Sequence, residues 1–210
     1  MPLTQYFFDG LVLAAALISC ARFGRISSEY YPFIFLVWLS VLQAFFFPSR
    51  VFSAPETWNK MSFLPLLNLL LITWQFSRWK HWRRTTNAVA LILLSSIYLL
   101  LYFFWNESLV AALFWMLASL LICFASINVI SPLLLRSGLS LLRSPRFVIS
   151  ATFLIYFTSI AVSSALSLSG LASGLTAGPL YVVFGGLQVL GGLSGCWVLL
   201  MLPRKKETLL

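Results

Sequence analysis

Seven long apolar stretches, separated by short polar segments, constrain this chain more than any other feature. They run over Leu3–Ala21, Tyr30–Phe47, Met61–Phe76, Asn87–Trp105, Leu109–Ile130, Phe147–Leu168 and Leu180–Leu202. A helix needs about 20 apolar residues to cross the core of a membrane, so seven helices would use about 140 of the 210 residues. What remains is too short for an attached kinase, an ATP-driven motor or a substrate-binding ectodomain.

The composition favours helices over any other spanning structure. Hydrophobic residues make up 60% of the chain and charged residues 9%, far from the balance of a soluble domain. Several stretches are continuous apolar runs without the alternation of a membrane barrel strand. The first stretch carries Asp9 where a signal peptide would be basic. We therefore predict an all-α polytopic membrane protein, with one seven-helix transmembrane domain over residues 1–210.

The distribution of Lys and Arg predicts the orientation. With seven spans, 12 of the 14 basic residues share one side, and only Arg50 and Lys60 lie on the other. Short loops rich in Lys and Arg face the cytoplasm. We expect the N-terminus outside and the C-terminus inside, in the plasma (inner) membrane of a bacterium. The 12 residues are Arg22, Arg25, Arg78, Lys80, Arg83, Arg84, Arg136, Arg143, Arg146, Arg204, Lys205 and Lys206.

The net charge of +9 does not indicate nucleic-acid binding, because the basic residues are dispersed over four short segments beside membrane ends. The densest segment interleaves cations with tryptophan, as headgroup-level anchors do. We predict contact with lipids or with a protein partner there. The residues are Arg78, Trp79, Lys80, Trp82, Arg83 and Arg84.

Groups that carry chemistry are scarce in the apolar stretches. All five acidic residues lie at span ends or in loops, whereas ion-coupled carriers usually place a carboxylate near the middle of the membrane. The single histidine, His81, has no neighbours at metal-ligand spacing. Gly192–Gly195 matches the Gly-x-Ser-Gly of rhomboid proteases, but no histidine follows it. The last stretch also lacks the lysine of a retinal protein. We expect no enzyme activity, no metal and no cofactor.

Neutral polar side chains are the remaining candidates for a binding site. Asn68 and Gln75 share a helix face in the third stretch because they are two turns apart. Asn128 and Gln188 can join them from the fifth and seventh stretches. Such side chains either hydrogen-bond between helices, for about 0.6 to 2 kcal/mol each, or line a pocket for a small neutral or amphipathic ligand. The sequence leaves both interpretations open.

Glycines interrupt the seventh stretch at Gly185, Gly186, Gly191, Gly192 and Gly195. The spacing of Gly191 and Gly195 is that of a Gly-x-x-x-Gly motif, which lets another helix approach closely. We predict a helix-packing groove, within the chain or in a homodimer. A break that lines a ligand site is the alternative.

Several short segments resemble a group of small bacterial seven-helix membrane proteins. They are Arg22-Phe23, Glu29–Pro32, Asn59 to Arg78-Trp79 through the third stretch, Ser144–Ile149 and Leu154–Phe157. Members of that group resemble the membrane sensing portions that accompany histidine kinases, so the resemblance implies a sensing module. Those relatives tend to carry a glutamate inside the third span, where this chain has Leu67, Asn68 and Leu69.

Two functions of different classes fit these observations. The first is a receptor-like or accessory membrane module, in which a small or lipid-like ligand acts through a membrane or cytoplasmic protein partner. The second is a carrier or channel for a neutral or lipid-like solute, or a structural subunit of a membrane complex. Partners would be membrane lipids, another protein or a second copy of the chain.

Overall fold

The computed structural model describes residues 3–46, 64–79, 89, 92–93, 95–99, 107–135, 141–169 and 177–203. This part of the chain is helical and contains no strand, which confirms the predicted all-α class. The long helices are α1 (Leu3–Arg22), α2 (Tyr31–Phe46), α3 (Leu64–Arg78), α5 (Glu107–Leu134), α6 (Pro145–Leu168) and α7 (Ala177–Met201). Three short 3-10 helices are η1 (Phe23–Arg25), η2 (Ser28–Tyr30) and η4 (Leu141–Arg143).

Three helices among the described residues are long and apolar enough to cross a membrane. Their apolar spans are Tyr6–Arg25, Ala112–Leu134 and Pro145–Leu166. Two shorter apolar helices cover Ser28–Leu42 and Val189–Met201. The membrane class predicted from the sequence is therefore supported by α1, α5 and α6. Most of the predicted span Asn87–Trp105 lies outside the described residues.

Prolines begin several of these helices. Pro32, Pro65 and Pro145 lie in the first turns of α2, α3 and α6, where a missing N–H removes no helical hydrogen bond. The ring of proline also fixes a helical φ in advance. These positions explain why the helices start close to the beginnings of the apolar runs.

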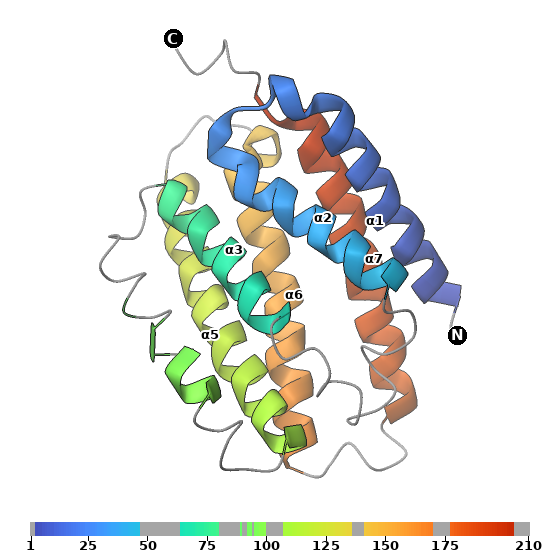
Figure 1. Ribbon diagram of the computed structural model, residues 1–210, viewed down its shortest axis with the longest axis vertical. Helices are drawn as coiled ribbons and strands as arrows, with labels where there is room; N and C mark the ends of the chain where they lie inside the picture. Colours follow the sequence, from blue (N-terminus) through green and yellow to red (C-terminus); the bar gives the residue numbers. More distant parts are fainter. Residues whose placement is uncertain are drawn as a thin grey trace.

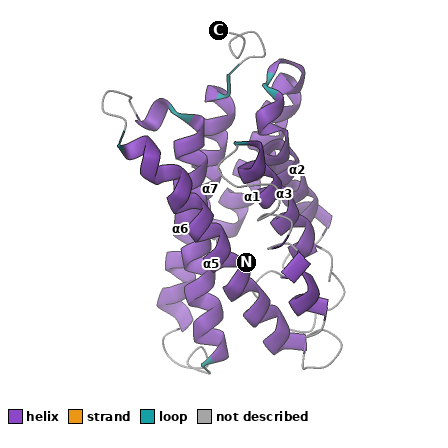
Figure 2. Cartoon of the chain, turned by 90° about the vertical axis from the view of Figure 1, so that its left-hand side faces the viewer, coloured by secondary structure: helices purple, strands orange, loops and turns teal. Residues whose placement is uncertain are grey.

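The six long helices form a ring. Each packs against the next in the order α1, α2, α3, α5, α6, α7, and α7 packs against α1 to close it. Helices that follow one another in the described chain run roughly antiparallel, except α3 and α5 (Figure 1). In the quarter-turned view the same helices extend along the length of the bundle (Figure 2).

The α5–α6 pair is the most extensive helix contact, and small residues make it close. Ser119, Cys123 and Ser126 share one face of α5, and the Cys123 sulfur lies 3.4 Å from the Thr158 hydroxyl of α6. Ser119 and Ser126 are fully buried, as is Ser150 of α6. Without hydrophobic driving force between helices in lipid, such small side chains allow close van der Waals packing.

The candidate ligand cavity and the polar junction

A cavity of about 190 Å³ lies in the middle of the ring, and every one of the six long helices contributes to its wall. Six of the lining side chains are aromatic and most of the rest are aliphatic or glycine. The aromatic residues are Phe8, Phe33, Trp115, Phe153, Tyr156 and Phe157. Pockets of this kind, largely apolar with a few polar groups, are typical small-molecule sites.

Among the described lining residues, four besides Trp115 have polar side chains, Ser40, Asn68, Thr152 and Tyr156, and none is charged. The Ser40 hydroxyl donates to the Leu36 carbonyl at 2.9 Å, and the Thr152 hydroxyl hydrogen-bonds within its own helix and to Ser194. The Asn68 amide and the Tyr156 hydroxyl have no hydrogen-bond partner among the described residues. These two groups are therefore available to a molecule in the cavity.

Glycines form the α7 part of the wall. A Cβ atom added at Gly191 or Gly195 would have no atom within 4 Å, whereas a Cβ added at Gly192 would lie 3.0 Å from Leu11 Cβ of α1. Gly192 is therefore the close-packing position between α1 and α7. The predicted helix packing is therefore seen at Gly192, whereas Gly191 and Gly195 have open space beside them and, with Gly192, line the cavity. Gly186 also has open space, and the surroundings of Gly185 lie outside the described residues.

A hydroxyl pair ties α6 to α7 beside these glycines. Thr152 Oγ1 and Ser194 Oγ are 2.9 Å apart, and the Ser194 hydroxyl also lies 2.9 Å from the Gly191 carbonyl. Hydrogen bonds between helices in a membrane contribute about 0.6 to 2 kcal/mol. The pair fixes the separation of the glycine face of α7 from the aromatic side chains of α6.

The residues predicted to line one pocket lie at different places in the structure. Asn68 lines the cavity. Gln75 is buried but is not part of the cavity wall. Asn128 is exposed on the outer face of α5. Gln188 belongs to α7, but its side chain is outside the described residues. The three described residues therefore do not form one site, and of these three only Asn68 lies at the cavity.

Gln75 instead joins α3 to the start of α2. Its Oε1 accepts the Phe33 backbone N–H at 2.9 Å, and its Nε2 donates to the Glu29 carbonyl at 2.8 Å. Phe33 lies in the first turn of α2, where backbone N–H groups have no partner within the helix. The fully buried amide of Gln75 thus takes the role of a helix cap supplied by a neighbouring helix.

The same end of the bundle contains two arginine contacts. Arg146, at the start of α6, pairs with Glu29 at 2.8 Å. Arg22, at the end of α1, donates to the Leu199 and Leu202 carbonyls at the end of α7. A cation beside the last carbonyls of a helix also interacts favourably with the helix dipole. We call Arg22, Glu29, Gln75 and Arg146 the polar junction; it links α1, η2, α3, α6 and α7.

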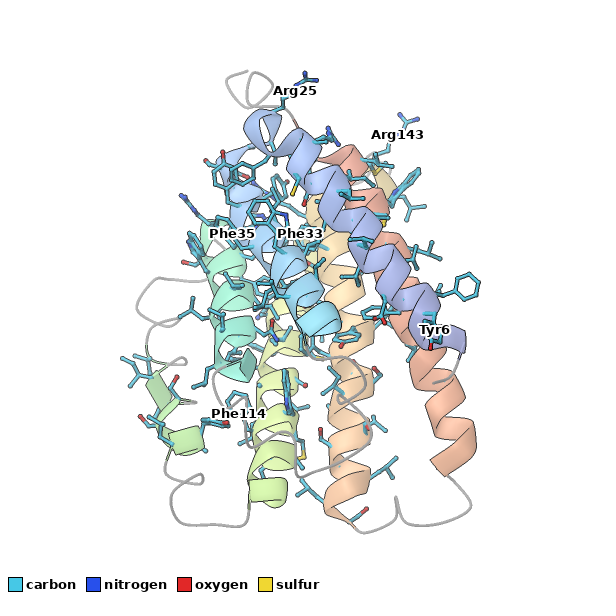
Figure 3. The ribbon with its side chains drawn as sticks, turned by 45° about the vertical axis from the view of Figure 1, so that its right-hand side comes forward. Tyr6, Arg25, Phe33, Phe35, Phe114 and Arg143 are labelled. Carbon is cyan, nitrogen blue, oxygen red and sulfur yellow. The ribbon has the colours of Figure 1, made fainter. Side chains whose placement is uncertain are left out.

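All basic residues in the described part of the chain lie at this end of the bundle. They are Arg22, Arg25, Arg78, Arg143 and Arg146. Arg25 and Arg143 project from it, and Tyr6 lies toward the opposite half (Figure 3).

The Trp79 side chain is buried, so it cannot make the predicted contact with lipid or a partner. Its side chain is 2% exposed, and its ring packs against Phe76 and Tyr30 at centroid distances of 5.7 and 6.2 Å. The indole covers η2 because α3 ends directly beside it. Arg78 is exposed, whereas Lys80, Trp82, Arg83 and Arg84 lie outside the described residues, so the predicted contact of these residues stays a prediction.

Sequence reasoning missed the Glu29–Arg146 pair and the Thr152–Ser194 pair. Opposite charges beside the starts of two apolar stretches were the only signal for the first. The second carried no signal beyond two hydroxyls within spans.

Comparisons with protein-family models, curated proteins and solved structures find no match. The resemblance to bacterial sensing modules therefore stays a prediction. Two of its segments, Glu29–Pro32 and Ser144–Ile149, meet in space through the Glu29–Arg146 pair.

Proposed function

We propose that this protein is a receptor-like or accessory membrane module that binds a small ligand in its central cavity and acts through a partner. The proposal includes seven transmembrane helices in a bacterial inner membrane, with the N-terminus outside and the polar junction at the cytoplasmic side. The gathering of the described basic residues at one end of the bundle supports this orientation, because short cytoplasmic segments are enriched in Lys and Arg.

The observation that carries the proposal is a cavity bordered by polar groups that have no hydrogen-bond partner among the described residues. Asn68 and Tyr156 lie on different helices, α3 and α6, and both line the same space of about 190 Å³. A polar group in an apolar interior is costly when it makes no hydrogen bond. A ligand that bonds to them would recover that free energy and would hold α3 and α6 in one arrangement.

The helices that line the cavity also meet at the polar junction. Phe33 lines the cavity with its side chain, while Gln75 holds its backbone N–H. Ile149, one turn after Arg146 on α6, is a second lining residue. A ligand that shifts α2 or α6 would therefore change contacts at the proposed cytoplasmic end, which favours a receptor over a simple carrier.

The ligand test compares two matched substitutions in nanodiscs. Native mass spectrometry should detect a small-molecule adduct on the wild-type chain that is reduced in Asn68→Leu and kept in full in Asn128→Leu, where the asparagine is exposed outside the cavity. Circular dichroism confirms that both variants keep their helices. Equal adducts in all three proteins would exclude the cavity as the binding site.

The partner test uses a photo-crosslinking amino acid at Arg143, which is exposed at the junction end, with the exposed Tyr6 as the control position. We expect one defined protein product at Arg143 in whole cells and none at Tyr6. Solute uptake into proteoliposomes that Asn68→Leu abolishes, without a crosslinked product, would favour the carrier instead.

A further inference from the structure

Most of the described α7 wall of the cavity is backbone, because Gly191, Gly192 and Gly195 line it together with Val198. Gly191 and Gly195 are one turn apart, and open space lies where each Cβ would stand. Glycine lets a ligand approach the helix backbone closely. The Thr152–Ser194 contact joins α6 and α7 beside this surface and fixes their separation there. A face about one helical turn long without side chains therefore borders the cavity.

Aromatic rings supply another part of the wall. Phe33 and Phe153 have ring centroids 6.4 Å apart, and Phe153 and Phe157 lie edge to face at 6.0 Å. Tyr156 continues this cluster against Phe157 at 5.3 Å. Rings in edge-to-face contact present both faces and edges to a neighbour, and a further aromatic ring gains more from them than an alkyl chain of equal area.

The charge and size of the cavity further restrict the class of ligand that it can bind. None of the described lining residues can neutralise an ion, so a charged ligand would lose its hydration without compensation from them. An apolar cavity of about 150 Å³ admits benzene, and this one measures about 190 Å³. One aromatic ring with a small substituent therefore fits.

We infer that the cavity selects an uncharged, planar aromatic molecule that carries one hydrogen-bonding group, of the size of a phenol. The ring lies between the glycine face of α7 and the aromatic cluster, and its polar group meets the Asn68 amide or the Tyr156 hydroxyl. This inference rests on the proposed function, since it names the ligand class of the same cavity.

Fluorine NMR on the full chain in nanodiscs tests the class directly. The probes are 4-fluorophenol, fluorobenzene, 6-fluorohexan-1-ol and 4-fluorobenzoate, and line broadening reports the binding of each. Gly195→Leu fills the cavity, whereas Gly186→Leu places the same side chain on an exposed part of α7. Line broadening of a probe that remains in Gly195→Leu reports partition of that probe into the lipid rather than binding in the cavity.

We expect 4-fluorophenol to bind most tightly, with loss of binding in Gly195→Leu and retention in Gly186→Leu. Asn68→Leu combined with Tyr156→Phe should weaken 4-fluorophenol about 3- to 10-fold, the effect of one hydrogen bond, and leave fluorobenzene unchanged. The benzoate should not bind.

Two results would overturn the inference in different ways. If 6-fluorohexan-1-ol binds in a Gly195-dependent manner and the aromatic probes do not, the aromatic class is wrong but the cavity remains a binding site. If Gly195→Leu changes the line broadening of no probe, the aromatic ligand class is wrong. The cavity is then also not the binding site of the proposed function.

Discussion

Two amides on the same face of α3 have opposite surroundings. Gln75, at the polar junction, uses both of its polar atoms to hold the start of α2. Asn68, two turns earlier, borders the cavity without a partner in the described part of the chain. Residues of one chemical kind thus have two roles in our proposal: the junction residue is tied to the fold, and the cavity residue binds a ligand. The comparison predicts that stability and binding can be altered separately.

The largest expected effect is on Gln75. Gln75→Leu leaves a buried backbone N–H and a carbonyl without partners, so we expect a loss of about 3 kcal/mol in the free energy of unfolding. Asn68→Leu should change it by less than about 1 kcal/mol, because no hydrogen bond is lost. Unfolding in mixed detergent micelles, followed by circular dichroism, measures both. Equal losses would contradict the distinction between the two amides.

The glycines of α7 sharpen the contrast within the cavity wall. Gly192→Val should destabilise the protein by about 2 kcal/mol, because its new methyl groups would overlap Leu11 of α1. Gly195→Ala should leave stability unchanged or raise it by about 0.5 kcal/mol, since open space receives the methyl group and alanine favours a helix. The same unfolding assay compares them. A destabilised Gly195→Ala would show that this face is packed.

The ion pair of the junction should contribute less than Gln75. Both Glu29 and Arg146 are more than a third exposed, so solvent screens their attraction. We expect Glu29→Gln to cost about 0.5 to 1 kcal/mol at low salt and less at 1 M salt. Unfolding at the two ionic strengths tests this. A salt-independent loss would mean that the Glu29 side chain acts through packing.

The smallest effect is expected at the hydroxyl pair beside the cavity. Ser194→Ala removes one hydrogen bond between α6 and α7, but Thr152 keeps its bond to the Val148 carbonyl. We expect about 0.5 kcal/mol of lost stability. Binding of 4-fluorophenol should weaken by more than this, because the spacing of α6 and α7 is no longer fixed. Unchanged binding of 4-fluorophenol in Ser194→Ala would show that the hydroxyl pair does not influence the cavity.

The sequence predicted the helical class because continuous apolar runs permit no other spanning structure. It also identified Asn68 and Gln75 as residues of one helix face. It could not tell them apart, because the partner of Gln75 is a backbone N–H of α2 that comes near only after α2 and α3 pack.

Rotation of helices about their axes explains the other differences. The spacing of Gly191 and Gly195 suits close packing, yet α1 meets α7 at Gly192, one position around the helix. Trp79 stands in a segment typical of a membrane interface, but the end of α3 turns its ring over η2. The hydropathy of a single helix predicts neither rotation, because each depends on the neighbouring helices.

The closure of the ring by α1 and α7 has a consequence for biosynthesis. These helices are far apart in the chain, yet they share a packing surface and the contacts of Arg22 with the Leu199 and Leu202 carbonyls. A chain emerging from the ribosome inserts α1 first, and α5 and α6 can pair locally before α7 exists. Until α7 arrives, one side of the cavity faces lipid. In the proposed function, the cavity is therefore completed only when α7 is inserted, and a ligand dissolved in the membrane can enter it up to that step.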